Sequence, residues 1–402
     1  MNEGYSDGKN LFSSGIGSNI FVGKKKFLDL SLCAGSLILG HNSEIFKKSL
    51  NQALKKNISN FAAKNEHAYS FSKTLKKKFP SYSKFIFCNS GTEAVFKSLR
   101  IARAVTKKEL IISVTGSWHG STGELLFTNN KKLNNTELSE GLDKQAKNKI
   151  KFIPYNNIEV SKKILNKHKK KIMCIIIEPI QGCLPQDAKK YLKFLDNYSK
   201  KNKILMIFDE MITGLRFNCS SVQSEFKLNP SITTFGKCFG GGLPIGIIAL
   251  KKDIVKKLDK KKKKVFFGGT FSGNSINTYV ANNVVNYILK NKKNIFENLK
   301  KKSEYLEKEL NNFFEKENYD AKCFRSCSML RIVFTKKIIE NRLQRDFFEK
   351  KKNHKINKLK KFFMSKNIYY PNSGIIFIAT STSFNNLKNL VKITKLAFKK
   401  IF

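Results

Sequence analysis

The sequence predicts an α/β protein with a mostly parallel central sheet in a large domain and a smaller domain towards the C-terminus. Short uncharged apolar runs recur along the first two thirds of the chain, and such runs are typical of strands buried on both faces of a parallel sheet. Residues 94–105, between two of these runs, carry apolar side chains at helical spacing. The runs occupy residues 85–88, 110–114, 172–177, 204–208 and 245–250. Because 402 residues exceed the size at which one core keeps growing, we expect two domains.

The pattern changes after about residue 280. Glycine-punctuated apolar runs give way to long lysine-rich helical stretches such as residues 283–314, which favour a separate C-terminal domain. Residues 128–150 are polar and predict a long excursion from the sheet, and the run Lys260 to Lys264 predicts a solvated turn.

The formal net charge of +47 raises the question of a nucleic-acid or anionic membrane partner. The lysines are spread along the whole chain, without a basic tail or stripe, and only seven of the 77 basic residues are arginine. Abundant Lys, Asn, Ile and Phe are also expected from a genome rich in A/T codons. A basic nucleic-acid-binding protein on a degenerate enzyme fold therefore stays as the weaker alternative to an enzyme.

The eight cysteines include no C-x-x-C pair, and the five histidines do not cluster near them. The sequence therefore predicts no metal site and no disulfide framework. Cys174, within an apolar run, is expected to act as a small hydrophobe. Residues 1–8 lack the apolar segment of a secretory signal, and no run is long enough to span a bilayer, so we expect a soluble cytoplasmic protein with no membrane partner.

One lysine stands apart from the others. Charged residues make up 27% of the chain, yet the 22 residues from Asn229 to Leu250 contain a single one, Lys237. Such a lysine either extends to solvent or is held for chemistry, because desolvation lowers the pKa of an ammonium towards its nucleophilic form. The three glycines at 240–242 are unfavourable in a helix, so we expect a turn there. The backbone of that turn would pass close to another group, which we take to be a cofactor in its pocket.

Ser90 to Glu93 follow one apolar run and open the helical segment. The Ser-x-x-Glu spacing is a capping box, which fixes a helix start. The exposed N–H groups at such a start can cradle a phosphate, with Gly91 allowing close approach and Thr92 adding a second hydroxyl. An ordinary helix cap explains the same residues, so this motif alone does not decide between the two roles.

Two further segments carry chemistry-bearing side chains. Asp209 and Glu210 end an apolar run, where parallel sheets place ligands, and a carboxylate there can hold a cofactor pyridinium protonated. Trp118, the only tryptophan, lies beside His119 between two glycines, an arrangement that suits stacking on a flat ring. A helix-capping acid and a core tryptophan with a satisfied histidine are the structural alternatives.

A phosphate cradle, an acid at a strand end, an aromatic plate and an isolated lysine are together what pyridoxal phosphate (PLP) requires. In their order along the chain these motifs resemble the class III aminotransferases, and most closely the glutamate-1-semialdehyde 2,1-aminomutase branch. The matching blocks are residues 87–94, 117–120, 177–182, 207–216, 234–246 and 269–274.

The resemblance implies PLP fold type I and a set of site residues. Lys237 would form the Schiff base with PLP, Asp209 would pair with the pyridine nitrogen, and Trp118 would take the ring-stacking position. Thr270 would reach the phosphate of the neighbouring subunit in a homodimer. The phosphate would be bound by Ser90, Gly91 and Thr92, and the further residues expected near the cofactor are His119, Glu178 and Glu210.

The resemblance also implies how the domains divide. Residues 49–279 would form the large PLP-binding domain and residues 280–402 the small domain. Residues 1–48 would be an N-terminal segment that contributes to the small domain.

Two departures from the aminomutase pattern concern the substrate. Residues 11–21 lack the arginine that grips the substrate carboxylate in that branch, and the glycine- and serine-rich gating loop is not recognisable in residues 127–135. A mutase must hold its diamine intermediate until the second amino group reacts. We therefore expect an aminotransferase that moves an amino group from a small-molecule donor to a small carbonyl acceptor, with the intramolecular aminomutase as the alternative.

Overall fold

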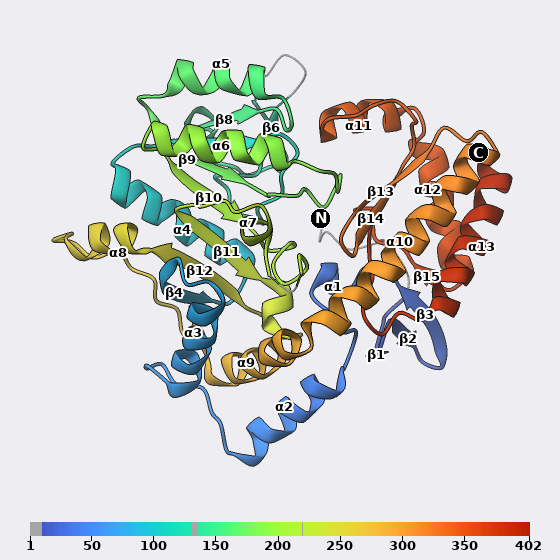
Figure 1. Cartoon of the computed structure of the whole chain (residues 1–402), viewed down its shortest axis with the longest axis horizontal. Helices are drawn as coiled ribbons and strands as arrows, with labels where there is room; N and C mark the ends of the chain where they lie inside the picture. Colours follow the sequence, from blue (N-terminus) through green and yellow to red (C-terminus); the bar gives the residue numbers. More distant parts are fainter. Residues whose placement is uncertain (1–9, 130–134, 219) are drawn as a thin grey trace. The chain divides into compact units, whose positions relative to one another are not determined.

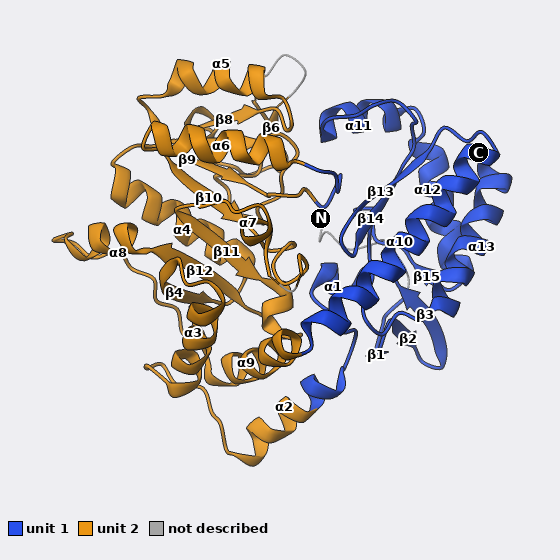
Figure 2. Cartoon of the chain, viewed as in Figure 1, with its two compact units in different colours: residues 1–47, 182–187, 291–402 blue, residues 48–181, 188–290 orange. Residues whose placement is uncertain are grey.

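The computed structural model describes residues 10–129, 135–218 and 220–402. Residues 1–8, Cys219 and the central part of the 127–135 segment, about which the sequence made predictions, lie wholly outside the described residues. The chain forms two compact units, one of residues 1–47, 182–187 and 291–402 (unit 1) and one of residues 48–181 and 188–290 (unit 2) (Figure 2). The domain boundaries expected at residues 48 and 279 stay a prediction, because compactness alone does not make a segment a domain.

Unit 2 is built around a seven-stranded sheet with the order β4-β12-β11-β10-β9-β5-β8 (Figure 1). Neighbouring strands from β11 to β8 are parallel, whereas β12 runs antiparallel to both β11 and β4. This confirms the predicted α/β class with a mostly parallel sheet. The strands are β4 (Tyr82–Cys88), β5 (Leu110–Val114), β8 (Ile150–Ile153), β9 (Ile172–Ile177), β10 (Leu205–Asp209), β11 (Ile232–Gly236) and β12 (Gly246–Lys251).

The apolar runs become strands because the sheet is covered on both faces. All six residues of β9 and all five of β10 are buried, and the only charged residue among them is Asp209 at the end of β10. Every apolar run that the sequence predicted as a strand lies in this sheet, including β4, β5 and β12. Two strands, β8 and β11, were not predicted, since β8 ends the polar excursion and β11 contains Thr233 and Thr234.

Helices pack around the sheet of unit 2 (Figure 1). Helix α4 contacts strands β9 to β12, and it includes the predicted helical residues 94–105. The helices of this unit are α3 (Glu66–Lys78), α4 (Gly91–Thr106), α5 (Ile158–His168), α6 (Lys189–Lys201), α7 (Val222–Glu225), α8 (Lys252–Asp259) and α9 (Ser275–Lys290), while α2 (Glu44–Lys55) runs across the boundary between the units.

The glycine-rich segment after β11 forms one short 3₁₀ turn, η2 (Lys237–Gly240). Gly241 and Gly242 follow with φ of 63° and 117°, values that favour glycine, so the predicted turn is present. Its reason differs from the expected one. A β-carbon on Gly241 would lie 2.8 Å from the side chain of Val284 in α9. The glycine is therefore needed for the close packing of this turn against α9, not for space beside a cofactor.

The predicted excursion at residues 128–150 contains little regular structure. Its described residues form a two-stranded sheet of β6 (Phe127–Asn129) and β7 (Asn135–Glu137), followed by the 3₁₀ turn η1 (Ala146–Lys149). The lysine run at residues 260–264 follows α8 and is mostly exposed, as predicted for a solvated turn.

Unit 1 contains two small sheets, ordered β1-β2-β3-β15 and β13-β14-β16. The strands are β1 (Ser14–Ile16), β2 (Asn19–Val22), β3 (Lys25–Asp29), β13 (Lys322–Ser326), β14 (Met329–Val333), β15 (Ile368–Tyr369) and β16 (Ile375–Phe377). The helices are α1 (Leu32–Gly35), α10 (Lys292–Lys316), α11 (Arg342–Lys350), α12 (Asn353–Ser365) and α13 (Phe384–Ile401). The predicted helical stretch at residues 283–314 is divided between α9 and α10. Within the described ranges, no helix is both long and apolar enough to cross a membrane.

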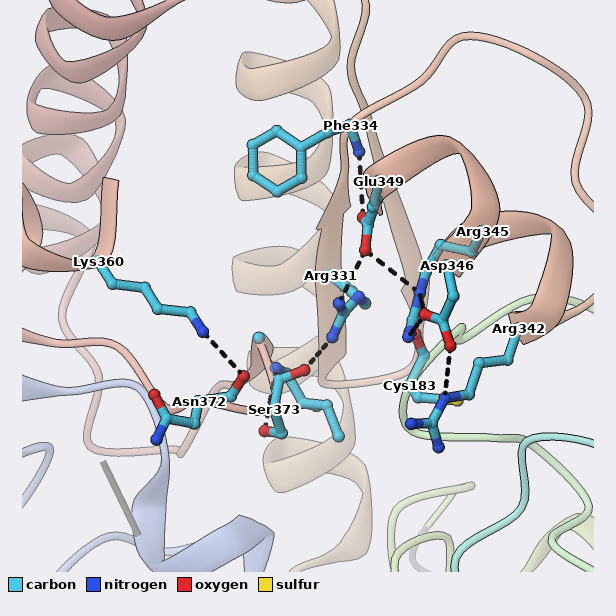
Figure 3. Close-up of polar contacts among 12 residues, drawn as sticks. Cys183, Arg331, Phe334, Arg342, Arg345, Asp346, Glu349, Lys360, Asn372 and Ser373 are labelled. Carbon is cyan, nitrogen blue, oxygen red and sulfur yellow. Dashed lines mark hydrogen bonds and ion pairs between the residues drawn. The ribbon is translucent and has the colours of Figure 1, made fainter. Parts of the chain in front are cut away.

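A buried ionic network holds α11 to the sheet of unit 1 (Figure 3). Glu349 accepts contacts from Arg331 and Arg345, each at 3.4 Å, and from the backbone N–H of Phe334 at 3.3 Å. Arg331 also donates to the backbone carbonyl of Ser373. Sharing one carboxylate between two guanidinium groups offsets part of the cost of burying them.

Candidate active site

Three chemically active side chains follow neighbouring strands of the unit 2 sheet. Asp209 is the last residue of β10, Glu178 comes directly after β9, and Lys237 comes directly after β11. These strands are adjacent and parallel, so their carboxyl ends meet at one edge of the sheet. Ligands bind at this edge in α/β proteins, and the strand order explains why residues 59 positions apart come together there.

Asp209 is fixed by three hydrogen bonds in a buried setting. Its Oδ2 lies 2.8 Å from His119 Nδ1, and its Oδ1 accepts from Thr234 Oγ1 at 3.0 Å and from the backbone N–H of Met211 at 3.2 Å. With the carboxylate ionised, His119 Nδ1 is the donor, which leaves Nε2 as an acceptor. That Nε2 is buried without a hydrogen-bond partner among the described residues.

Glu178 is the second buried acid of the site. Its Oε1 accepts the backbone N–H of Trp118 at 2.6 Å, which ties the tryptophan turn to the end of β9. Burial raises the pKa of Glu178 to about 7, although the nearby His119 and the Trp118 N–H act in the opposite direction. A carboxyl group with this pKa can both give and take a proton near neutral pH.

Lys237 occupies a strained position beside these acids. It is half-buried, and its φ of 47° lies in the left-handed region that side chains other than glycine rarely adopt. Burial lowers the pKa of Lys237 below its ordinary value, while Glu178 and Asp209 partly oppose that shift. Within the described chain we find no hydrogen bond or ion pair to its Nζ. Strain of this kind, with an unengaged amine, is typical of functional positions.

The start of α4 has the geometry of a phosphate cradle. Ser90 is the N-cap, and its Oγ accepts the backbone N–H of Glu93 at 3.1 Å. The Glu93 carboxylate accepts the N–H of Asn89 at 2.8 Å, so the predicted capping box is present with its return bond displaced by one residue. Gly91 and Thr92 lie in the first turn of α4, where backbone N–H groups have no carbonyl partner within the helix. Such N–H groups attract anions.

The tryptophan turn is tied to the same helix start. Thr92 Oγ1 accepts the backbone N–H of Ser121 at 3.1 Å. Gly120, with φ of 81°, lies so close that a β-carbon on it would be 2.3 Å from Thr92 Oγ1. The indole of Trp118 is 56% exposed, which rules out the alternative of a core tryptophan. Its side chain is therefore available to a ligand.

Glycines at this edge let the backbone segments approach one another. Met211 Sδ would lie 2.9 Å from a β-carbon on Gly91 and 2.7 Å from one on Gly236. At Gly246, in β12, a β-carbon would lie 2.1 Å from the backbone oxygen of Ser90. The start of α4 thus rests directly on β12, and its position depends on the absence of a side chain there.

We predict that Gly246→Ala lowers the free energy of unfolding by about 2 kcal/mol, because its methyl group meets backbone rather than a movable side chain. The matched control is Gly123→Ala, whose β-carbon would make an ordinary 3.9 Å contact with Leu142 and which should stay within about 0.5 kcal/mol of wild type. Urea denaturation measures both. Equal midpoints for the two variants would contradict the close approach of β12 and α4.

Two predicted site residues lie apart from this cluster. Glu210 points to the start of α7, where it accepts Val222 N–H at 2.9 Å, Gln223 N–H at 3.0 Å and the Thr213 hydroxyl at 2.7 Å. It therefore acts as a cap for that segment, the alternative that the sequence had left open for this pair of acids. Thr270 is exposed on the segment between α8 and α9, and none of the hydrogen bonds described for Asp209 and Glu178 involves it.

An open cavity of about 480 Å³ lies beside the first turn of α4. Its walls include Ser90 and Thr92, but they also carry the acids Glu93, Glu124 and Asp143, and they do not include Lys237. Glu93 pairs with Lys97 and Glu124 with Arg103, and the walls include neither Glu178 nor Asp209. We therefore place the candidate site at the strand ends rather than in this cavity.

Three contributors to the site were missed from the sequence. Thr234 orients Asp209, Met211 packs against Gly91 and Gly236, and Arg216, which is 2% exposed, donates to Cys238 Sγ at 3.5 Å beside Lys237. A signal existed for Thr234, because two polar residues precede the glycine in an otherwise apolar stretch. Nothing local in the sequence indicates the other two.

The donor and acceptor set fits PLP. An unengaged amine is available at Lys237, and a buried carboxylate is held by three hydrogen bonds at Asp209. The buried His119 Nε2 lacks a partner among the described residues, which indicates that a polar group is missing from its surroundings. The start of α4 adds free N–H groups for a phosphate.

Comparisons with known proteins agree with this chemistry. The family model described as aminotransferase class-III matches residues 21–359. A glutamate-1-semialdehyde 2,1-aminomutase of Thermodesulfovibrio yellowstonii is 31% identical over 96% of this chain and 90% of its own length. An omega-transaminase of Sphaerobacter thermophilus has the same fold, with a TM-score of 0.90, 19% identity and coverage of 99% and 93% of the two chains. A glutamate-1-semialdehyde aminomutase of Pseudomonas aeruginosa PAO1, in complex with PMP, gives a TM-score of 0.85, 13% identity and coverage of 98% and 88%. The chain therefore belongs to the class III aminotransferases, which are PLP-dependent enzymes of fold type I.

Proposed function

We propose that this protein transfers an amino group from a small-molecule donor to a small carbonyl acceptor, using PLP bound covalently to Lys237. The observation that carries the proposal is the unengaged Nζ of Lys237, whose pKa is lowered by burial, at the sheet edge it shares with Glu178 and Asp209. A lysine without a hydrogen-bond partner, whose pKa is lowered by burial and which is flanked by two acids, suits covalent binding of a carbonyl group.

The residues around Lys237 would divide the binding of PLP among them. Asp209 would hold a proton on the pyridine nitrogen, oriented by His119 at 2.8 Å. Ser90, Gly91 and Thr92 would bind the phosphate through hydroxyl and backbone N–H groups, and the exposed indole of Trp118 would cover the ring. When bound, PLP supplies the electron sink that stabilises negative charge on the substrate carbon.

Proton movement would fall to Lys237 and Glu178. The lowered pKa of Lys237 leaves its Nζ able to take a proton and return it within the pocket. Glu178, with a pKa of about 7, would exchange protons with its surroundings while its Oε1 keeps the Trp118 turn in place. Glu210 has no such part in this proposal, since its contacts are those of a cap.

We further propose a homodimer in which Thr270 reaches the phosphate in the neighbouring subunit. Support comes from large apolar side chains that unit 2 leaves exposed, as surfaces that bind a partner do. Arg100 links two of them, since its guanidinium lies 4.5 Å from the ring of Phe96 and donates to the backbone oxygen of Phe266 at 3.1 Å. Exposed side chains of this kind include Phe61, Tyr69, Phe96, Phe266 and Phe271. Buried thiols at Cys88, Cys174 and Cys323 fit the cytoplasmic location that we also propose.

Intramolecular amino transfer is the second candidate. It is favoured by the name of the Thermodesulfovibrio yellowstonii relative and opposed by the absence of arginine from residues 11–21. Without that side chain the substrate carboxylate would lose a bidentate partner. Transfer between two molecules requires less retention of an intermediate and is our primary proposal.

A donor screen distinguishes the two candidates. The purified enzyme is mixed with single amines, and conversion of bound PLP to its pyridoxamine form is followed by absorbance. We expect a donor to convert the cofactor and a carbonyl acceptor to restore it. Turnover of glutamate-1-semialdehyde with no added donor or acceptor, and no response to other amines, would instead establish the aminomutase.

A further inference from the structure

Lys97 differs from nearly all other lysines of this chain. It lies in the second turn of α4 and is 4% exposed, and among the described residues only Lys302 shares this degree of burial. Lysine is rarely buried unless its charge is paired and its donors are used. We therefore expect Lys97 to have partners that offset the free energy lost when its ammonium group leaves water.

All three N–H donors of Lys97 are used. Its Nζ pairs with Glu93 Oε1 and donates to the backbone oxygens of Phe267 at 2.7 Å and Gly268 at 3.3 Å. An ammonium group has three donors, so this set satisfies it fully. A solvated surface lysine has no need of such an arrangement.

These bonds join two parts of unit 2 that lie 170 residues apart in sequence. On one side is Glu93, whose other oxygen caps the start of α4 through Asn89 N–H. On the other side is the run of residues 266–270, which we call the Thr270 segment. Gly269 lies beside Glu93, since a β-carbon on it would make an ordinary contact of 3.5 Å with Glu93 Oε1. Arg100, one turn further along α4, holds the segment at the backbone oxygen of Phe266.

We infer that Lys97 is a positioning residue that fixes the Thr270 segment so that Thr270 can bind the cofactor phosphate of the neighbouring subunit. The inference rests on the proposed homodimer. It deepens that proposal by naming the side chain that sets the segment and by predicting that its effect appears in the other subunit's site.

Removal of the Lys97 ammonium acts unequally on the two parts that it joins. The backbone oxygens of Phe267 and Gly268 lose their donor, so the Thr270 segment loses its main anchor and regains conformational freedom. Glu93 keeps its bond to Asn89 N–H, and Ser90 still caps Glu93 N–H, so the phosphate cradle of the same chain remains. The loss of PLP affinity should therefore appear in the site of the neighbouring subunit and not in the site of the substituted chain.

The first experiment compares Lys97→Met, which keeps the stem and removes the donors, with Thr270→Ala and wild type. We expect the dissociation constant for PLP to rise roughly tenfold in both variants, because Thr270→Ala removes a hydrogen bond to the charged phosphate and Lys97→Met releases the segment that positions that hydroxyl. Arg100→Met removes the bond to Phe266 and the guanidinium contact with the Phe96 ring but leaves the bonds of Lys97 in place, so it should raise the constant by about threefold. This milder variant carries the test if Lys97→Met fails to fold.

Mixed dimers then locate the effect. In the first, a chain with both Lys97→Met and Lys237→Ala is paired with a wild-type chain, so the remaining Lys237 faces a loosened Thr270 segment. In the second, the two substitutions are on different chains, so the remaining Lys237 faces an intact segment. Borohydride then fixes whatever PLP is bound at the remaining Lys237, so labelling at increasing PLP concentrations gives the dissociation constant of that site. We expect this constant to be roughly tenfold higher in the first dimer than in wild type and normal in the second. Arg100→Met can replace Lys97→Met in both dimers.

Each outcome has a separate meaning. A defect confined to the second dimer would show that Lys97 acts on its own subunit and would overturn the inference. Normal PLP affinity in Lys97→Met, together with weak binding in Thr270→Ala, would overturn the inference while leaving the proposed dimer site intact. Normal affinity in Thr270→Ala would overturn the proposed role of Thr270 itself.

Discussion

Replacing Lys237 by alanine is expected to lower the rate of amino transfer on the order of 10⁴-fold, because the amine that binds the cofactor and moves the proton is lost. Burial lowers the pKa of its Nζ, although Glu178 and Asp209 partly oppose that shift, and no hydrogen bond to the Nζ is recorded among the described residues. Single-turnover conversion of PLP by a saturating amine donor measures the loss. Folding should be preserved, since alanine has the smaller side chain and removes no hydrogen bond that the structure records.

The control for this variant is Lys227→Ala. Lys227 also has a left-handed backbone, with φ of 54°, but it lies just after α7 rather than at the end of a sheet strand. Both substitutions change a lysine of this conformation, so they share any effect of the backbone. A rate loss in Lys227→Ala as large as that in Lys237→Ala would contradict a chemical role for Lys237.

The second large effect is expected from Asp209→Asn, which keeps the shape of the side chain and removes its charge. A charge pair at about 4 Å and an effective dielectric near 20 is worth roughly 4 kcal/mol, which corresponds to about a 10³-fold loss in kcat/KM. The new asparagine amide also replaces the carboxylate that lies 2.8 Å from His119 Nδ1, so the hydrogen bond between the two side chains changes. Steady-state kinetics give the rate, and the absorbance of bound PLP reports the protonation of its ring nitrogen.

Glu210→Gln is the matched control for Asp209→Asn, because the two acids are adjacent and both are buried. Its rate should stay within a few-fold of wild type, while its stability falls, since Glu210 accepts three hydrogen bonds around the start of α7. Equal rate losses in the two variants would show that any buried negative charge here supports activity, contrary to the specific role of Asp209.

The sequence predicts the sheet well because strands buried on both faces carry few charges. That rule locates β4, β5, β9, β10 and β12 by their uncharged apolar runs. It fails for β11, where Thr233 and Thr234 break the apolar pattern. The hydroxyl of Thr234 bonds to Asp209 on the neighbouring strand. Its polarity can be seen in the sequence, but the identity of its partner depends on the strand register.

The same division holds for the site. Local motifs indicate Ser90, Asp209 and Lys237, because a capping box, a strand end and an isolated lysine can each be recognised within a few residues. Partners far apart in sequence are beyond such reasoning: His119 meets Asp209 across 90 positions, and Lys97 meets Phe267 across 170. Glycines 240–242 predicted a turn correctly, but the helix that occupies the space at Gly241 is set by the tertiary packing.

Borohydride reduction of the PLP-loaded enzyme tests the central claim most directly. Reduction fixes the cofactor to the amine that holds it, and mass spectrometry of the peptides then identifies the residue. We expect the phosphopyridoxyl group on Lys237 alone, out of the many lysines of this chain. Recovery of the group on another lysine, or an enzyme that binds no PLP, would contradict the proposed active site.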